Sequence, residues 1–411
     1  MNLLIRPFRG LRPVPEKAAD VLAPPYDVLN TEEARKSVIG KPYSFLHISK
    51  PEIDLPPETS PFAPEVYAKG AENLAKLLAD GILIREEGPV YYIYRLRMGE
   101  HTQTGIVAVT SVLAYDTNRV RKHEHTRPEK EDDRVRQIDA LNAQTGPVLL
   151  AYKANKNIQN LIDGVASGAP LCEVTASDGI IHTMWIMNDP SAIEHLTKLI
   201  DNMDALYIAD GHHRSAAASR VAAARRNSQP QTDSHEYFLT VAFAHDQTNI
   251  LDYNRVIRDL GGLTDADFLA KVREYFKVKE SGTQVVPNGP GCFGMYLAGK
   301  WYQLEVRPQF IPKDDPVARL DVNLLQNNLI NPILKISDPR RDKRIDFVGG
   351  IRGLGELERR VNSGEMKGAF VLFPTSMEQL IAVADAGGVM PPKSTWFEPK
   401  LADGLVSHVL D

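Results

Sequence analysis

The segment Ala205–Asn227 constrains the fold of this 411-residue chain more than any other stretch. Its first residues (ALYIA) form a short apolar run typical of a buried strand, and the polar turn DGHHR follows at once. Ser215–Arg226 is rich in alanine, the strongest helix former, and Phe238–Ala244 is again apolar. A strand, a helix and a further strand in this order indicate an α/β region.

The rest of the first 260 residues repeats this alternation. Val90–Leu96 and Gly105–Tyr115 are apolar and β-branched, and they predict a hairpin across the polar stretch Met98–Thr104. Strands are also expected at Val148–Tyr152 and Thr183–Met187, and helices at Ala63–Asp80, Glu129–Ala143 and Pro190 to about Ile200.

Prolines are frequent in the first 65 residues, among them the consecutive pair Pro24-Pro25. Proline stops helices and holds the chain extended. Apolar residues such as Phe8, Leu11 and Phe45 are interleaved with these prolines. We therefore expect an ordered, extended segment that lies on a core.

The last third differs in pattern, and Gly261-Gly262 separates it from what precedes. We expect an α/β (α+β) protein in which residues 1–260 form a mixed-sheet unit and residues 261–411 a smaller α/β layer. In this layer we predict a helix at Asp265–Phe276, a hairpin at Cys292–Val306, a helix at Val317–Ile336 broken near Pro332, strands at Arg344–Val348 and Ala369–Phe373, and helices at Leu354–Val361 and Ser376–Ala384.

The composition argues against several classes of protein. Lys and Arg number 48 against 53 Asp and Glu, a net charge of −5, whereas coating of DNA relies on excess positive charge. Cys172 and Cys292 form neither a disulfide framework nor a four-cysteine zinc site. No apolar run approaches the ~18 residues of a membrane span, and the N-terminus lacks the apolar stretch of a signal peptide. We expect a soluble cytoplasmic protein without nucleic-acid or membrane partners, and its state of association is left open.

The pentad Asp210-Gly211-His212-His213-Arg214 is the strongest candidate site. A helix N-terminus presents unpaired amides and a partial positive charge, which together bind anions such as phosphate. Gly211 lets a ligand approach the backbone, Arg214 offers a planar fork of donors, and the two histidines can donate to an anion or shuttle protons. Asp210 is suited to hold Mg²⁺, to orient a histidine or to accept a proton. The simpler alternative is that Asp210 caps the helix while the histidines and Arg214 lie in solvent.

A second stretch, Lys122–Arg134 (KHEHTRPEKEDDR), is dense in acid–base groups. Glu124 is a candidate general base, and His125 is its neighbour. His123 and His125 could also bind a metal, but their spacing provides no third ligand. Composition alone favours a solvated loop before a helix.

Two proline-flanked stretches carry further candidates. Pro24-Pro25 fixes the direction of Asp27, which suits a site and a buried turn equally. Lys393 can reach a phosphate as a point charge, with Lys400 close behind it. The alternative for Lys393 is a C-terminal strand packed by the aromatic residues that follow it.

The pentad resembles the Asp-Gly-His-His-Arg signature of the ParB/sulfiredoxin superfamily, in the form known from archaeal free-serine kinases. Over nearly its full length the chain resembles domain-of-unknown-function family 1015 (DUF1015), sometimes labelled Spo0J/ParB-like. The stretches that carry this resemblance are Ala23–Asn30 (APPYDVLN), His123–Arg134, Ala209–Arg214 (ADGHHR), Ile250–Ile257 (ILDYNRVI) and Met390–Leu405.

The resemblance implies a ParB/sulfiredoxin-like first unit with nucleotide phosphates at the helix start, and hence a phosphate-binding role for Asp210, Gly211, His212, His213 and Arg214. The archaeal kinases place a catalytic carboxylate before the pentad. Asp27, Glu32 and Glu124 are the candidates for it here.

Two functions follow as hypotheses. The first is a small-molecule phosphotransferase that uses ATP or ADP and Mg²⁺ to phosphorylate free L-serine or a similar hydroxyl compound. Its catalytic candidates are Glu124, Asp210, Asp27 and His125, with Lys393 among the phosphate-binding residues and Asp210 on the metal. The second is a ParB-like, nucleotide-dependent binding or chromosome-partitioning protein without catalysis. The first requires that His123–Thr126 lie within one small-ligand span of His212–Arg214.

Overall fold

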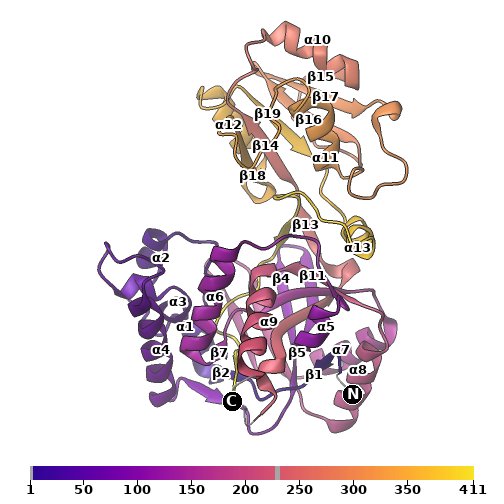
Figure 1. Cartoon of the computed structure of the whole chain (residues 1–411). Helices are drawn as coiled ribbons and strands as arrows, with labels where there is room; N and C mark the ends of the chain where they lie inside the picture. The colour runs from indigo at the N-terminus through magenta and orange to yellow at the C-terminus, as the bar shows by residue number, and fades with distance from the viewer. Residues whose placement is uncertain (1–2, 227–231) are drawn as a thin grey trace. The chain divides into compact units, whose positions relative to one another are not determined.

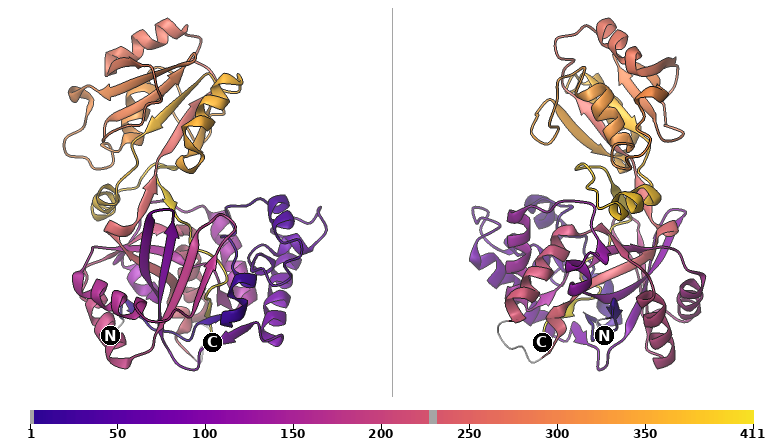
Figure 2. Two further views of the ribbon diagram at one scale, coloured as in Figure 1. Left: turned by 180° about the vertical axis from the view of Figure 1, so that it is seen from behind. Right: turned by 45° about the vertical axis from the view of Figure 1, so that its right-hand side comes forward.

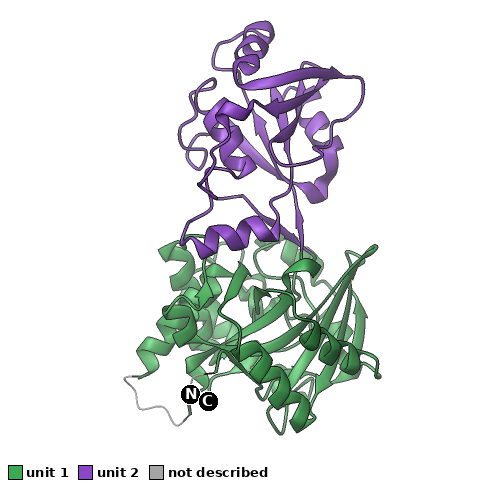
Figure 3. Cartoon of the chain, turned by 90° about the vertical axis from the view of Figure 1, so that its right-hand side faces the viewer, with its two compact units in different colours: residues 1–248, 399–411 green, residues 249–398 purple. Residues whose placement is uncertain are grey.

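The computed structural model describes residues 3–226 and 232–411, and its contacts divide the chain into two compact units. The first contains residues 1–248 and 399–411, and the second contains residues 249–398 (Figure 3). The sequence had suggested a boundary near residue 260 and had assigned the final residues to the second unit. Their place in the first unit rests on backbone hydrogen bonds, which join Asp403 to Ala23 and Ser407 to Leu11. Such isolated pairs leave no periodic pattern in the sequence.

A mixed sheet forms the centre of the first unit. Its strands are β1 (Ile5–Arg6), β4 (Tyr91–Met98), β5 (His101–Ser111), β6 (Val120–Arg121), β8 (Val148–Tyr152), β9 (Cys172–Thr175), β10 (Ile181–Met187), β11 (Leu206–Asp210) and β12 (Tyr237–Ala244). Within the described residues these nine strands run in the order β6-β11-β8-β12-β5-β4-β10-β9, with β1 beside β5. Figure 1 labels β1, β4, β5 and β11 of this sheet. The pairs β6–β11 and β8–β12 are parallel and the others antiparallel, which confirms the expected mixed α/β class.

Helices cover the sheet because their apolar residues share one core with it. Val112, Ile158, Leu196 and Ala218 all belong to the cluster that contains Ile93 and Leu150 of the strands. The left view of Figure 2 shows the sheet from behind, with its strands towards the viewer. The helices that contribute to this core are α5 (Val112–Asp116), α7 (Lys156–Ala166), α8 (Pro190–Asp201) and α9 (His212–Arg226), and α6 (Pro128–Leu141) packs on α9.

The strand predicted at Gly105–Tyr115 ends earlier than expected. The strand β5 stops at Ser111 and α5 begins, because the Ser111 side chain accepts a hydrogen bond from Ala114 N–H and caps the helix. The connector expected at Met98–Thr104 is reduced to a tight turn at Gly99, whose φ is 58°, so both strands extend into it.

The residues described before position 65 are ordered, as expected, but they contain several short helices as well as extended chain. They form a core of their own with α4, around Val21, Phe45 and Leu74. Pro51 and Pro64 each occupy the first turn of a helix, where a missing N–H costs nothing. The elements are β2 (Leu11–Pro13), α1 (Ala18–Val21), α2 (Thr31–Ser37), α3 (Leu46–Ser49), α4 (Pro64–Ala79) and β3 (Leu83–Arg85), with β7 (Ala143–Gln144) and β21 (His408–Val409) as a separate pair.

The second unit has a sheet of its own, which is antiparallel throughout. Its described strands β14 (Tyr253–Ile257), β15 (Phe276–Ser281), β16 (Cys292–Leu297), β17 (Lys300–Val306), β18 (Ile345–Gly349) and β19 (Gly368–Leu372) run in the order β15-β17-β16-β19-β14-β18. The remaining elements are β13 (Asn249–Leu251), paired with β20 (Trp396–Glu398), and the helices α10 (Asp265–Tyr275), α11 (Asp321–Leu325), α12 (Gly353–Asn362) and α13 (Met377–Asp385).

The long helix predicted at Val317–Ile336 was wrong in extent. The helix α11 ends at Leu325, and Gln326–Ile330 continues as one π-helical turn before the chain turns at Pro332. Among the residues that the structure describes, no helix is both long and apolar enough to span a bilayer.

Candidate functional site at the start of helix α9

The pentad lies where β11 passes into α9. The strand includes Asp210, Gly211 forms the turn, and the helix begins at His212. The helix had been expected to begin only at Ser215, so His212, His213 and Arg214 occupy its first turn instead of a preceding loop. Their amides therefore belong to the turn that has no intrahelical carbonyl partners.

Gly211 makes this tight junction possible. Its φ is +101°, a conformation that side chains disfavour, and an added Cβ would lie 3.1 Å from Arg214 Nε. The glycine thus allows both the turn and the close packing of the arginine beneath it.

We expect Gly211→Ala to lower the free energy of unfolding by about 1–3 kcal/mol, because the backbone strain and the contact with Arg214 add. Urea unfolding followed by circular dichroism measures this. Gly164→Ala in α7 is the matched control, since a Cβ there meets nothing within 4 Å. Gly164→Ala should leave the free energy of unfolding unchanged or raise it. The same result for Gly211→Ala would show that Gly211 is not needed for the turn.

Asp210 is held between two positive charges. Its Oδ2 lies 3.3 Å from Arg214 Nη2 and 3.8 Å from Lys400 Nζ. Desolvation would raise the pKa of Asp210, but Lys400 and Arg214 outweigh it and lower the pKa to about 2. Asp210 is therefore ionised, and it makes ion pairs with Arg214 and Lys400.

Arg214 is folded back into the protein. Its Nη1 donates to the Pro147 carbonyl oxygen and its Nη2 to Asp210, and the side chain is only 12% exposed. This burial excludes the alternative in which Arg214 lies in solvent, and His212 is buried as well. Within the pentad, the Arg214 guanidinium contacts the Asp210 carboxylate.

The stretch Lys122–Arg134 contacts the pentad, as expected. His123 N–H donates to His212 Nε2 at 3.4 Å, and Arg127 N–H donates to His213 Nε2 at 3.0 Å. Glu124 Oε2 lies 3.9 Å from His212 Nδ1, and the rings of His123 and His212 meet edge to face with centroids 4.4 Å apart. The loop that carries Glu124 is therefore in direct contact with the first turn of α9.

The histidines of this contact are neutral near pH 7. Burial lowers the pKa of His123 to about 4, and burial together with the charge of His123 lowers the pKa of His212 well below its usual value. Burial also lowers the pKa of His213, although Glu131 opposes it. Glu124 is the half-exposed member of the group, with 45% of its side chain accessible.

His123, Glu124 and His212 place one ligand atom each within 4.8 Å of one another. Two imidazoles and a carboxylate are a donor set known for transition metals. Glu124 and His212 join His123 in this group, whereas His125 of the expected pair is not part of it. However, His212 Nε2 accepts a hydrogen bond, so the ring proton lies on Nδ1, the nitrogen that faces Glu124. A cation bound here would have to displace that proton.

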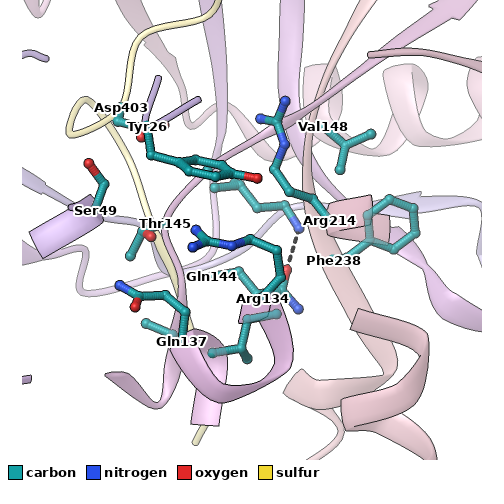
Figure 4. A pocket seen from close by; sticks show the side chains of 14 residues that line it. Tyr26, Ser49, Arg134, Gln137, Gln144, Thr145, Val148, Arg214, Phe238 and Asp403 are labelled. Atoms are coloured by element: carbon teal, nitrogen blue, oxygen red, sulfur yellow. Dashed lines mark hydrogen bonds between the residues drawn. The ribbon is translucent and has the colours of Figure 1, made fainter. Parts of the chain in front are cut away.

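A cavity of about 30 Å³ lies beside Arg214 and is lined by Tyr26, Arg134, Thr145 and Asp403 (Figure 4). This volume suits one or two water molecules. Asp403 is 2% exposed, and its Oδ1 has no hydrogen-bond partner among the described residues. Burial raises the pKa of Asp403 to about 7, against the opposing charge of Arg214.

The remaining candidates lie on three separate exposed segments. Asp27 is exposed in the turn after Tyr26, and its charge acts on the pKa of both Arg214 and Asp403, so it lies in the same neighbourhood. Glu32 is exposed in α2 and pairs with Lys36. His125 is exposed in the loop before α6.

The C-terminal lysines divide between the units. Lys393 belongs to the second unit, where its carbonyl oxygen accepts from Arg255 and its Nζ lies 5.4 Å from the Tyr253 ring centroid. Lys400 belongs to the first unit and reaches Asp210. The sequence drew attention to both lysines and selected Lys393, and the structure shows Lys400 to be a partner of Asp210 within the first unit.

The fold and this site define a two-unit mixed α/β protein with a histidine-rich strand–helix junction. A family model described as "Protein of unknown function (DUF1015)" matches residues 5–323, so the chain belongs to that family, as the resemblance had indicated. No curated protein matches it.

Several solved structures are similar to the chain. A free serine kinase mutant in complex with AMP has 12% sequence identity and a TM-score of 0.36, over 73% of this chain and 92% of that one. A conserved hypothetical protein from Pyrococcus furiosus has 12% identity and a TM-score of 0.35, over 73% and 95%. SbnI with a C-terminal truncation from Staphylococcus aureus has 11% identity and a TM-score of 0.31, over 72% and 85%. Similarity at this level leaves the function to be argued from the chain's own residues.

Proposed function

We propose that the protein is a phosphotransferase that binds a nucleotide at the start of α9 and transfers its phosphoryl group to a small hydroxyl compound. One observation carries this proposal: the Glu124 carboxylate lies 3.9 Å from His212, in the first turn of a 15-residue helix. A helix start that suits phosphate and an accessible carboxylate beside it are the two parts that phosphoryl transfer to an alcohol requires.

Each part has a residue in this arrangement. The amides of the first turn of α9 would contact phosphate oxygens, with Lys400 as the neighbouring cation. Glu124 would accept the proton of the attacking hydroxyl. Asp27 is the alternative base, and it would approach from the turn held by Pro24 and Pro25.

A divalent cation is part of the proposal. Mg²⁺ prefers carboxylate oxygens, and the Asp210 side chain is 39% exposed. Asp210 would hold the ion in exchange for its ion pairs with Arg214 and Lys400, and the ion would neutralise phosphate charge.

A screen of donors and acceptors with the purified protein tests the function. ATP and ADP are the donors, each with Mg²⁺, and free L-serine is the first acceptor, followed by other small alcohols. Formation of a phosphorylated acceptor, read by ³¹P NMR, is the expected result. Nucleotide binding without transfer to any acceptor would favour the nucleotide-dependent binding protein of the ParB-like kind.

We expect Arg214→Ala to weaken nucleotide binding by at least ~1.5 kcal/mol, because Asp210 loses a charge-assisted hydrogen bond of that scale and keeps an uncompensated negative charge beside the helix start. Removal of the guanidinium leaves Asp210 with one fewer counter-charge, so the helix start becomes less attractive to an anion. Isothermal titration calorimetry with ADP measures the affinity. Arg225→Ala, at the far end of the same helix, is the control and should leave it unchanged. Equal affinities for wild type and Arg214→Ala would refute the phosphate site.

A further inference from the structure

The two histidines of the pentad accept hydrogen bonds at Nε2, whereas a side chain that binds phosphate oxygens would have to donate them. His212 Nε2 accepts from His123 N–H and His213 Nε2 accepts from Arg127 N–H. A neutral imidazole carries its proton on the nitrogen that does not accept. In both rings the proton therefore lies on Nδ1, and neither Nε2 can donate to a phosphate oxygen.

These two hydrogen bonds lie on either side of Glu124. Residues 122–127 contain neither helix nor strand, so ordering each residue of this loop costs about 1–2 kcal/mol of backbone entropy. His123 is 2% exposed and anchors the first end, and Arg127 is held at the other. Between them the Nδ1–H of His212 faces the Glu124 carboxylate, 3.9 Å from its Oε2.

We infer that His212 and His213 are positioning residues that hold the loop 123–127, and with it Glu124, against the start of α9. They act on the reaction through the loop, because the Nε2 of each ring is taken up by a backbone amide of that loop. The inference rests on the proposed function only for the role of Glu124; the positioning itself is independent of it.

Amide hydrogen exchange tests the positioning in the full-length protein without nucleotide. His213→Leu removes the acceptor of Arg127 N–H, and loss of a hydrogen bond worth ~1 kcal/mol should speed exchange of that amide ~5-fold. His213→Gln should restore protection, because its amide oxygen can accept near the position of Nε2. His195→Leu, an exposed histidine of α8, is the matched control. Circular dichroism verifies that each variant is folded.

Two results would overturn the inference. One is unchanged exchange of the Arg127 amide in His213→Leu. The other, which holds even if the leucine variant fails to fold, is loss of protection in a folded His213→Gln.

Kinetics separate positioning from phosphate binding. A positioning role predicts that His213→Leu lowers kcat while the KM for nucleotide stays unchanged, and that His213→Gln restores kcat. If His213→Leu raises the KM for nucleotide and His213→Gln does not restore it, His213 binds phosphate, and the inference is overturned. Faster exchange in His213→Leu, with no transfer by any form of the protein, would uphold the positioning role and refute the proposed function.

Discussion

Replacement of Glu124 by glutamine is expected to abolish phosphoryl transfer and to leave nucleotide affinity nearly unchanged. Glutamine has the size of glutamate but cannot accept a proton from a hydroxyl, and a positioned general base contributes about 10²–10⁴-fold to the rate. Because the contribution is made only in the transition state, kcat should fall while ADP affinity, measured by calorimetry, stays the same.

Two further variants make this result specific. Glu129→Gln removes an exposed carboxylate in the first turn of α6 and should leave the rate unchanged. Asp27→Asn tests the alternative base. Full activity in Glu124→Gln together with a large loss in Asp27→Asn would transfer the base role to Asp27.

Asp321→Asn is expected to stabilise the second unit at pH 8 but not at pH 4. Asp321 is 6% exposed, its Oδ1 accepts from Gly291 N–H, and its Oδ2 has no partner among the described residues. Burial raises the pKa of this carboxyl from 3.8 to about 7, against the opposing hydrogen bond from Gly291. The folded unit therefore keeps a proton that the unfolded chain has already released.

The sign of the pH dependence follows from this proton. Between pH 4 and pH 7 unfolding releases it, so the free energy of unfolding falls as the pH rises and stays low above pH 7. A difference of about three pKa units corresponds to at most ~4 kcal/mol. Asparagine carries no proton to lose, so Asp321→Asn should remove most of this dependence.

Tryptophan fluorescence can follow the second unit by itself. Trp301 and Trp396 lie in it and Trp185 in the first unit, so Trp185→Phe provides a background that reports on the second unit alone. Urea unfolding at pH 4 and pH 8 then compares Asp321→Asn with Asp314→Asn, an exposed control. If the free energy of unfolding changes equally between pH 4 and pH 8 in the two variants, the raised pKa of Asp321 is refuted.

The sequence predicted those parts of the fold that depend on local pattern. The strand β11 and the helix α9 follow from an apolar run and an alanine-rich run, and both are confirmed. The short helices before α4 were missed because the frequent prolines were taken as a sign of extended chain, whereas Pro51 begins a helical turn and the capping box of Asn30 and Glu33 begins α2. The end of β5 was missed because one side chain, Ser111, caps a helix within a run that is apolar on both sides.

The candidate site was predictable only where chemistry suggested a partner. Glu124 was placed near His212 because a phosphate-binding turn needs a separate base, not because any periodicity links the two. Lys400 and Asp403 could not be selected, since the segment that carries them pairs through isolated bridges. The direction of the hydrogen bonds to His212 and His213 is equally invisible in the sequence, because it depends on which backbone amides the fold brings to each ring.

The return of residues 399–411 to the first unit has a consequence for biosynthesis. The ribosome makes all of the second unit before it reaches Lys400 and Asp403, and the second unit has its own sheet to fold on. The nascent first unit meanwhile lacks the segment that bonds to Leu11 and Ala23 and the lysine that pairs with Asp210. The junction at α9 is therefore completed only after the whole second unit has been made, and a ribosome that stalls within the second unit leaves it unfinished.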